Sequence, residues 1–388
     1  MSQPIQPTRL AGVDAARGLA VLGMIITHVA ITSESTVVAV ADGRSSILFA
    51  MLAGVSLSLL TGGRSIHPAL GVDRRRLAVR AGLLFVLGLL LEEISSGPFV
   101  ILCYYAVMFL LALPLLRVRP ALLLGGAAVW AVVGPLLSYG LRASSPIPDP
   151  DGIRLTFADF TSLPAIGDAA GQLLVTGIYP VLTWMPFLLA GIAVGRLDLR
   201  STAVRVRLLV GGVTAAVMGY GGSWLALNVL GGQAALLRGL TAYANSIGSS
   251  PNALLRQFAD LYGTVPAVTP AFLLVDTPHS GTPFEIIGSG GVAISVLAGC
   301  LLVAGPARVA LLPLTSVGAL ALTVYAGHIL VLGMLPYGTP WVLPNPWPLT
   351  IGFLGGAIAF AWLWRSVVGR GPLERLVHSI SLRAAGGA

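Results

Sequence analysis

The chain has 388 residues, of which 56% are hydrophobic and only 10% are charged. Soluble globular domains carry about a quarter charged residues, so this composition excludes a soluble fold and indicates a polytopic membrane protein. All 23 basic residues are arginines, and the absence of lysine excludes both a Schiff-base lysine and a Walker A phosphate loop. The two cysteines, Cys103 and Cys300, are too few for a cysteine-rich metal site, and we expect no bound metal.

Ten apolar runs each approach the roughly 20 residues that a helix needs to cross the hydrocarbon core of a bilayer. They predict an all-α bundle of about ten transmembrane helices, at about 13–34, 45–62, 77–96, 99–116, 121–141, 171–194, 208–229, 286–304, 312–335 and 348–365.

The arginine positions predict the orientation of this bundle. If the N-terminus is cytoplasmic, 18 of the 23 arginines fall in cytoplasmic segments and five in outer segments. Because basic residues concentrate on the cytoplasmic side, we expect both termini to be cytoplasmic in a multi-pass protein of the cell membrane. The net charge of +8 is then a signal of topology and does not indicate nucleic-acid binding.

Two segments, about 142–170 and 230–285, are much longer than the other connections and are predicted on the outer side. Long ordered loops often carry function or cover a site. The second segment contains His279, and its stretch Asn252–Tyr262 is predicted to form an amphipathic helix at the interface. The predicted outer face therefore contains residues that are suited to bind a polar ligand.

The first span carries three ionisable residues, Asp14, Arg17 and His28. Arg17 and His28 are 11 residues apart, which is about three helical turns and places them on one face about 16 Å apart. Asp14 precedes Arg17 by three residues and is positioned to pair with it. Ionisable groups inside a membrane are functional candidates, although an orientation arginine and a histidine bonded to a neighbouring helix are the alternative.

A second cluster, Arg74, Arg75, Arg76 and Arg80, lies at the cytoplasmic start of the third span. Guanidinium groups bind phosphates through paired hydrogen bonds, so a nucleotide-like anion or a lipid headgroup would fit this cluster. The positive-inside bias alone is the alternative explanation.

Three further residues are candidates for substrate binding. Arg44 lies at the outer end of the second span, His279 lies in the second long outer segment, and His328 lies in a polar stripe of the ninth span. Binding of a lipid phosphate by Arg44 and helix–helix hydrogen bonding by His328 are the alternatives.

The stretch from Arg9 to Met24, RLAGVDAARGLAVLGM, resembles the opening of the transmembrane acyltransferase superfamily. This superfamily includes the heparan-alpha-glucosaminide N-acetyltransferases, acyltransferase family three and YeiB-like membrane proteins, and its Arg-x10-His pattern is met by Arg17 and His28. Residues 43–54 resemble the second span of bacterial glucosaminide-acetyltransferase-like proteins, and residues 315–328 and 364–374 are similar to the YeiB-like C-terminal region. The matches predict one domain, 1–376, with an acetyltransferase-like half (1–200) and a YeiB-like half (201–376), followed by a cytoplasmic tail, 377–388.

The resemblance implies transfer of an acyl group, acetyl above all, from cytoplasmic acyl-CoA to an extracytoplasmic acceptor such as a sugar or glycan. By the same resemblance His28 is the catalytic histidine, and Arg17 with the Arg74–Arg80 cluster faces the phosphates of CoA. Membrane lipids are the other expected partners, and a homodimer is left open. The residues alone also allow a transporter or lipid-handling protein in which Arg17 and His28 line the substrate path.

Overall fold

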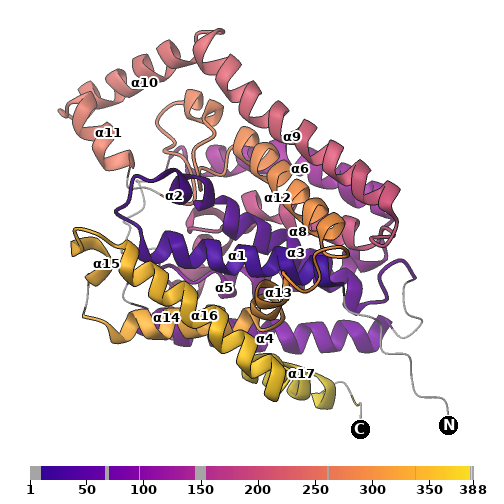
Figure 1. Ribbon diagram of the computed structural model, residues 1–388. Coiled ribbons are helices and arrows are strands. Elements are labelled where there is room, and N and C mark those ends of the chain that lie inside the picture. The colour runs from indigo at the N-terminus through magenta and orange to yellow at the C-terminus, as the bar shows by residue number, and fades with distance from the viewer. Residues whose placement is uncertain are drawn as a thin grey trace, which may run out of the picture.

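The protein is a bundle of helices in the computed structural model (Figure 1). The structure describes residues 10–65, 70–95, 97–144, 154–259, 262–336, 338–384 and 386. None of these residues forms a strand, so the all-helical prediction is confirmed for the part of the chain that the structure describes.

The main helices are listed here in chain order: α1 (Ala11–Val29), α2 (Thr36–Ala41), α3 (Arg44–Leu60), α4 (Leu70–Ile94), α5 (Leu102–Ala112), α6 (Pro120–Arg142), α7 (Leu163–Gly171), α8 (Val181–Gly195), α9 (Thr202–Asn228), α10 (Gly232–Ser246), α11 (Pro251–Ala259), α12 (Pro283–Val303), α13 (Leu312–Ala319), α14 (Ala321–Met334), α15 (Thr339–Val342), α16 (Trp347–Val367) and α17 (Pro372–Ala384). Four short helical turns join them: η1 (Leu113–Arg117), η3 (Phe157–Phe160), η4 (Gln172–Thr176) and η5 (Pro270–Leu274).

Among the described residues, six helical segments are long and apolar enough to cross a membrane, and eight are if each of two bent pairs forms one span. The bent pairs are Leu163–Thr176 with Val181–Gly195 and Leu312–Ala319 with Ala321–Met334. The protein is therefore a multi-pass membrane protein, as predicted. The predicted spans 77–96 and 99–116 lie outside this count because α4 carries charged residues at both ends and the α5–η1 segment is short. The number ten and the cytoplasmic position of the termini stay predictions.

Two runs that the sequence presents as continuous spans are interrupted. The helix axis turns by 59° between η4 and α8, where Pro180 provides no N–H group to continue the helix. The axis turns by 81° between α13 and α14, at Leu320, where the sequence contains no proline. This second break depends on contacts from distant helices, which are described with the site below.

Both long segments that are predicted on the outer side contain helices instead of irregular loop. Residues 142–170 include η3 and α7, and residues 145–153 of that segment lie outside the described residues. Residues 230–285 include α10, α11 and η5, and α11 covers most of the amphipathic helix predicted at Asn252–Tyr262. These elements share a small apolar core of their own, made of Leu240, Ala244, Leu254, Phe258, Val265 and Phe272.

Helix α1 lies in the interior of the bundle, where it packs against α3, α12, α13, α14 and α16 (Figure 1). Glycines allow the closest of these contacts, since a Cβ atom at Gly318 of α13 would collide with the backbone of Asp14 in α1. Gly54 of α3 and Gly191 of α8 make an equally close contact. Helix α1 is thereby enclosed on several sides, so polar side chains on it are placed in the protein interior.

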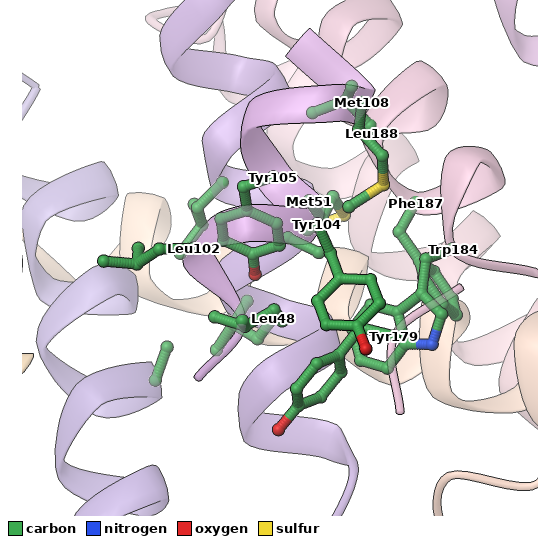
Figure 2. Packing of buried hydrophobic residues seen from close by; sticks show 14 of the residues in the cluster. Leu48, Met51, Leu102, Tyr104, Tyr105, Met108, Tyr179, Trp184, Phe187 and Leu188 are labelled. Atoms are coloured by element: carbon green, nitrogen blue, oxygen red, sulfur yellow. The ribbon is translucent and has the colours of Figure 1, made fainter. Parts of the chain in front are cut away.

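Buried aromatic side chains of α5, of α8 and of the residues just before α8 pack together (Figure 2). The rings of Tyr104 and Tyr179 meet edge to face with centroids 5.5 Å apart, and Tyr179 meets Trp184 in the same way at 4.9 Å. Such aromatic pairs stabilise a core beyond the area that they bury. The cluster gives the neighbouring polar site a rigid wall.

Helices α9 and α16 lie at the periphery of the bundle, and only 11% of the apolar window of each is buried. Large apolar side chains such as Val217, Trp224 and Leu363 are exposed there. In a membrane these side chains contact lipid acyl chains, which explains an apolar surface that a soluble protein would not tolerate.

Helix α17 crosses the predicted domain boundary at residue 376 and packs against α4 and α14. Its start at Pro372 agrees with the Gly371-Pro372-Leu373-Glu374 sequence, because proline suits the first turn of a helix.

Candidate active site

Two histidines from opposite ends of the chain meet inside the bundle. Nδ1 of His28 in α1 lies 2.9 Å from Nε2 of His328 in α14, and the ring planes are inclined by 19°. His328 is buried, whereas His28 is only partly buried because it lines a cavity. The structure therefore unites two residues that the sequence presents as separate candidates.

The contact between the two rings requires that one nitrogen donates and the other accepts. When Nδ1 of His28 carries the hydrogen, Nε2 of His328 accepts it. Nε2 of His28 then keeps its own lone pair and can act as a base.

The cavity beside His28 leaves about 20 Å³ for the centre of a water-sized molecule, which is room for about one or two waters. Its polar lining residues come from several distant segments: Thr27, His28, Ser45, Ser46, Tyr179, His279 and Tyr325. No group of three histidine, cysteine, aspartate or glutamate side chains within the described ranges is arranged to hold a metal ion. The site can host a single reacting group, and the rest of a larger substrate must lie outside the cavity.

His279 reaches this cavity from the segment that precedes α12. Its Nε2 lies 3.7 Å from Oδ1 of Asp42, at the end of α2. Burial lowers the pKa of His279 below its ordinary value, and the neighbouring carboxylate of Asp42 acts in the opposite direction. Segment 230–285 therefore contributes one side chain, His279, to the cavity lining.

Arg44 begins α3, next to the cavity-lining residues Gly43 and Ser45. Its Nε donates a hydrogen bond of 2.9 Å to the hydroxyl of Tyr220 in α9, and that hydroxyl lies 2.8 Å from the Ser289 hydroxyl in α12. In the structure Arg44 therefore joins three helices beside the cavity, and its guanidinium group is directed to Tyr220.

Asp14 and Arg17 form the ion pair that their spacing predicts, with an N–O distance of 3.2 Å. The same guanidinium group donates to the hydroxyl of Ser56 at 2.7 Å and to the carbonyl of Gly318 at 3.3 Å. Arg17 thus connects α1 to α3 and to the C-terminal end of α13, where the helix break begins. It stabilises the break because a cation is favourable beside the carbonyl end of a helix.

Only part of the predicted arginine cluster lies together. Arg76 and Arg80 lie in α4, where the charges of Arg17, Arg76 and Arg370 act on Arg80 in one direction and the carboxylate of Glu374 acts in the other. Arg74 instead donates to the carbonyl of Leu113 at 3.0 Å, on another side of α4. Arg75 is exposed.

The group Arg17, Arg76, Arg80 and Arg370 is called the inner arginine cluster below. No sequence pattern links Arg370 to this cluster, because it precedes α17 and reaches the cluster only through the packing of α17 on α4.

Glu374 is a second residue of this region whose role only the tertiary structure shows. Its Oε1 accepts hydrogen bonds from the backbone N–H groups of Leu322 (2.8 Å) and Thr323 (3.1 Å), and its Oε2 accepts one from the Thr323 hydroxyl (2.6 Å). The carboxylate therefore caps the N-terminus of α14, where negative charge is favourable. Arg17 thus contacts the end of α13 and Glu374 caps the start of α14, so the two residues stabilise the break from both sides. Helix α14 carries His328.

Replacing Glu374 by alanine is expected to destabilise the protein by about 1–3 kcal/mol, because two backbone donors and a hydroxyl lose their acceptor. Glu374→Gln keeps one acceptor oxygen, so it should destabilise the protein by about half as much as Glu374→Ala. Thermal unfolding in detergent and hydrogen exchange of the α14 amides measure the effect, with the exposed neighbour Arg375→Ala as control. Equal unfolding midpoints for Glu374→Ala and Arg375→Ala would contradict this role.

The fold and this site define a class: a multi-pass helical membrane protein with a histidine pair inside the bundle and an arginine cluster at the other end of the same central helix. Residues 9–224 match the family described as heparan-alpha-glucosaminide N-acetyltransferase, catalytic. Since the match covers more than half of the chain, the protein belongs to this family of acetyltransferases. A search of curated proteins gave no match.

The matched region contains His28 and the α1 and α4 arginines, whereas His279, His328 and Glu374 follow it in the chain. The site is thus completed by residues from outside the matched region.

Proposed function

We propose that the protein transfers an acetyl group from acyl-CoA, bound at the cytoplasmic side, to an amine or hydroxyl of a sugar or glycan on the outer side. The observation that carries this proposal is the 2.9 Å contact between His28 and His328 at a small cavity that His279 also lines. Membership of an acetyltransferase family supports the type of reaction.

The inner arginine cluster is the proposed site for the phosphates of the donor. Arg17 and His28 are about 16 Å apart along α1, so a donor whose phosphates bind at this cluster must extend its acyl end toward the cavity. The long, flexible pantetheine arm of CoA suits this task. Arginine is also the residue best suited to bind phosphate, because its planar group donates two parallel hydrogen bonds.

In the proposed reaction, the acceptor nitrogen or oxygen forms a bond to the thioester carbonyl carbon, and the carbon–sulfur bond breaks. Nε2 of His28 takes the proton from the attacking group and returns it to the thiolate of CoA. His328 positions the His28 ring, because the Nδ1–Nε2 contact determines which nitrogen of His28 holds the lone pair. Neither histidine needs to leave its place for this transfer.

The acceptor is proposed to enter from the side of His279 and Asp42, with only its reacting group inside the cavity. The small volume of the cavity favours this arrangement, since a whole sugar does not fit in the space of one or two waters. The proposed orientation follows from the arginine distribution, with both termini in the cytoplasm.

Purified protein in proteoliposomes tests the proposal, with labelled acetyl-CoA on one side of the membrane and glucosamine on the other. We expect N-acetylated sugar on the acceptor side and release of one CoA thiol for each acetyl group transferred. Labelling the two termini with impermeant reagents identifies the donor side, which should be the side of the termini. Passage of unmodified sugar without acetylation would contradict the proposal and support the transporter alternative.

A further inference from the structure

His279 adopts a backbone conformation that side-chain-bearing residues rarely use. Its φ is +58°, and among the described residues it is the one non-glycine residue with positive φ. The buried carboxylate of Glu285 holds this conformation, because Oε1 accepts the N–H of His279 at 2.8 Å and Oε2 accepts the N–H of Gly281 at 2.7 Å. Such backbone strain persists where surrounding contacts enforce it, and it is concentrated at functional sites.

Three aromatic rings fix the orientation of the imidazole itself. The ring centroids of Tyr179, Trp184 and Tyr262 lie 5.7, 6.1 and 5.6 Å from that of His279. The His279 side chain is 10% exposed, and its Nδ1 has no hydrogen-bond partner among the described residues. The protein thus maintains a rigid, buried imidazole with one nitrogen atom unsatisfied, an arrangement that packing alone does not require.

The other nitrogen of the ring faces a route to solvent. Nε2 lies 3.7 Å from Asp42, whose side chain is 31% exposed, while the ring also lines the cavity that contains His28. The ionisable groups around His279 are Asp42 from α2, Glu285 from α12, the two tyrosines named above and His28 from α1. Of these, Asp42 is the carboxylate that faces the ring and is partly exposed, so it is suited to accept a proton from His279.

We propose that His279 and Asp42 form a proton exit that serves acceptors carrying an amine. This inference rests on the proposed acetyl transfer. An ammonium group, R–NH3⁺, must lose one proton before its nitrogen can attack, and that proton passes to His279 and stays on its ring while the nitrogen–carbon bond forms. The carbon–sulfur bond then breaks, and the second N–H proton moves through His28 to the thiolate of CoA. The first proton finally leaves His279 through Asp42 to the outer solvent.

The proposal predicts how the pH dependence of the rate changes in His279→Asn and Asp42→Asn. Asparagine tolerates positive φ, so His279→Asn preserves the backbone. In the wild type, kcat/KM for a fixed total concentration of glucosamine should stay flat from high pH down to about 6.5, because burial keeps His279 neutral. In both variants only the free amine from solution reacts, so kcat/KM should fall about tenfold per pH unit below the pKa of the acceptor.

Above the acceptor pKa, both variants should approach the wild-type rate. Asp276→Asn, which removes a carboxylate from the same outer segment, is the matched control and should follow the wild-type profile. The proton exit would be overturned if Asp42→Asn lowered kcat/KM equally at every pH, or did not lower it at all. Because Asp42 is partly exposed, this variant tests the proposal even if His279→Asn fails to fold. Absence of any transfer by the wild type would overturn the proposed function itself, and this assignment with it.

Discussion

His28→Ala is expected to lower kcat for acetyl transfer by about 10²–10⁴-fold, the usual contribution of a positioned acid–base group. The affinity for acyl-CoA should stay unchanged, because Arg17, the member of the inner arginine cluster on α1, lies about three helical turns away from His28. Turnover of labelled acetyl-CoA, measured together with donor binding and thermal unfolding of the purified variant, separates loss of chemistry from loss of folding.

His328→Ala is the informative partner of this experiment. It removes the 2.9 Å contact but leaves His28 in place, so kcat should fall less than in His28→Ala. The double variant should be no slower than His28→Ala alone, because residues that act as one unit are not additive. Near-wild-type turnover of folded His28→Ala would show that the histidine pair is structural.

Arg80→Ala is expected to raise the KM and the Kd for acyl-CoA by about 10–100-fold, in keeping with about 1.5–3 kcal/mol for one charge-assisted phosphate contact. The reason is the position of Arg80 within the inner arginine cluster, beside Arg17 and Arg370. The value of kcat at saturating donor should change little, because the cluster does not touch the reacting atoms.

Arg75→Ala is the matched control, since it removes the same charge from an exposed position five residues earlier in α4. Its donor affinity should equal that of the wild type. Equal effects of Arg75→Ala and Arg80→Ala would indicate a diffuse surface potential, and no effect of either would remove the donor site from this end of the bundle.

The sequence was sufficient for those features that depend on neighbouring residues along one helix. Apolar runs predicted the six to eight segments that are long and apolar enough to cross a membrane, and the three-residue spacing of Asp14 and Arg17 predicted their ion pair. The spacing of Arg17 and His28 placed both on one helical face, and the motif around them indicated the family that the match over residues 9–224 confirms. Helical periodicity and hydropathy are local properties, so one chain segment is enough to reveal them.

The tertiary structure alone decided which distant residues meet. His28 and His328 are separated by 300 positions, and Glu374 caps a helix that begins about 50 residues earlier in the chain. No proline marks the break at Leu320 in the sequence. The break is stabilised instead by Arg17 from α1 and Glu374 from α17. Such contacts depend on how closely whole helices approach, which glycines such as Gly318 permit, and on charges that must find partners inside the bundle.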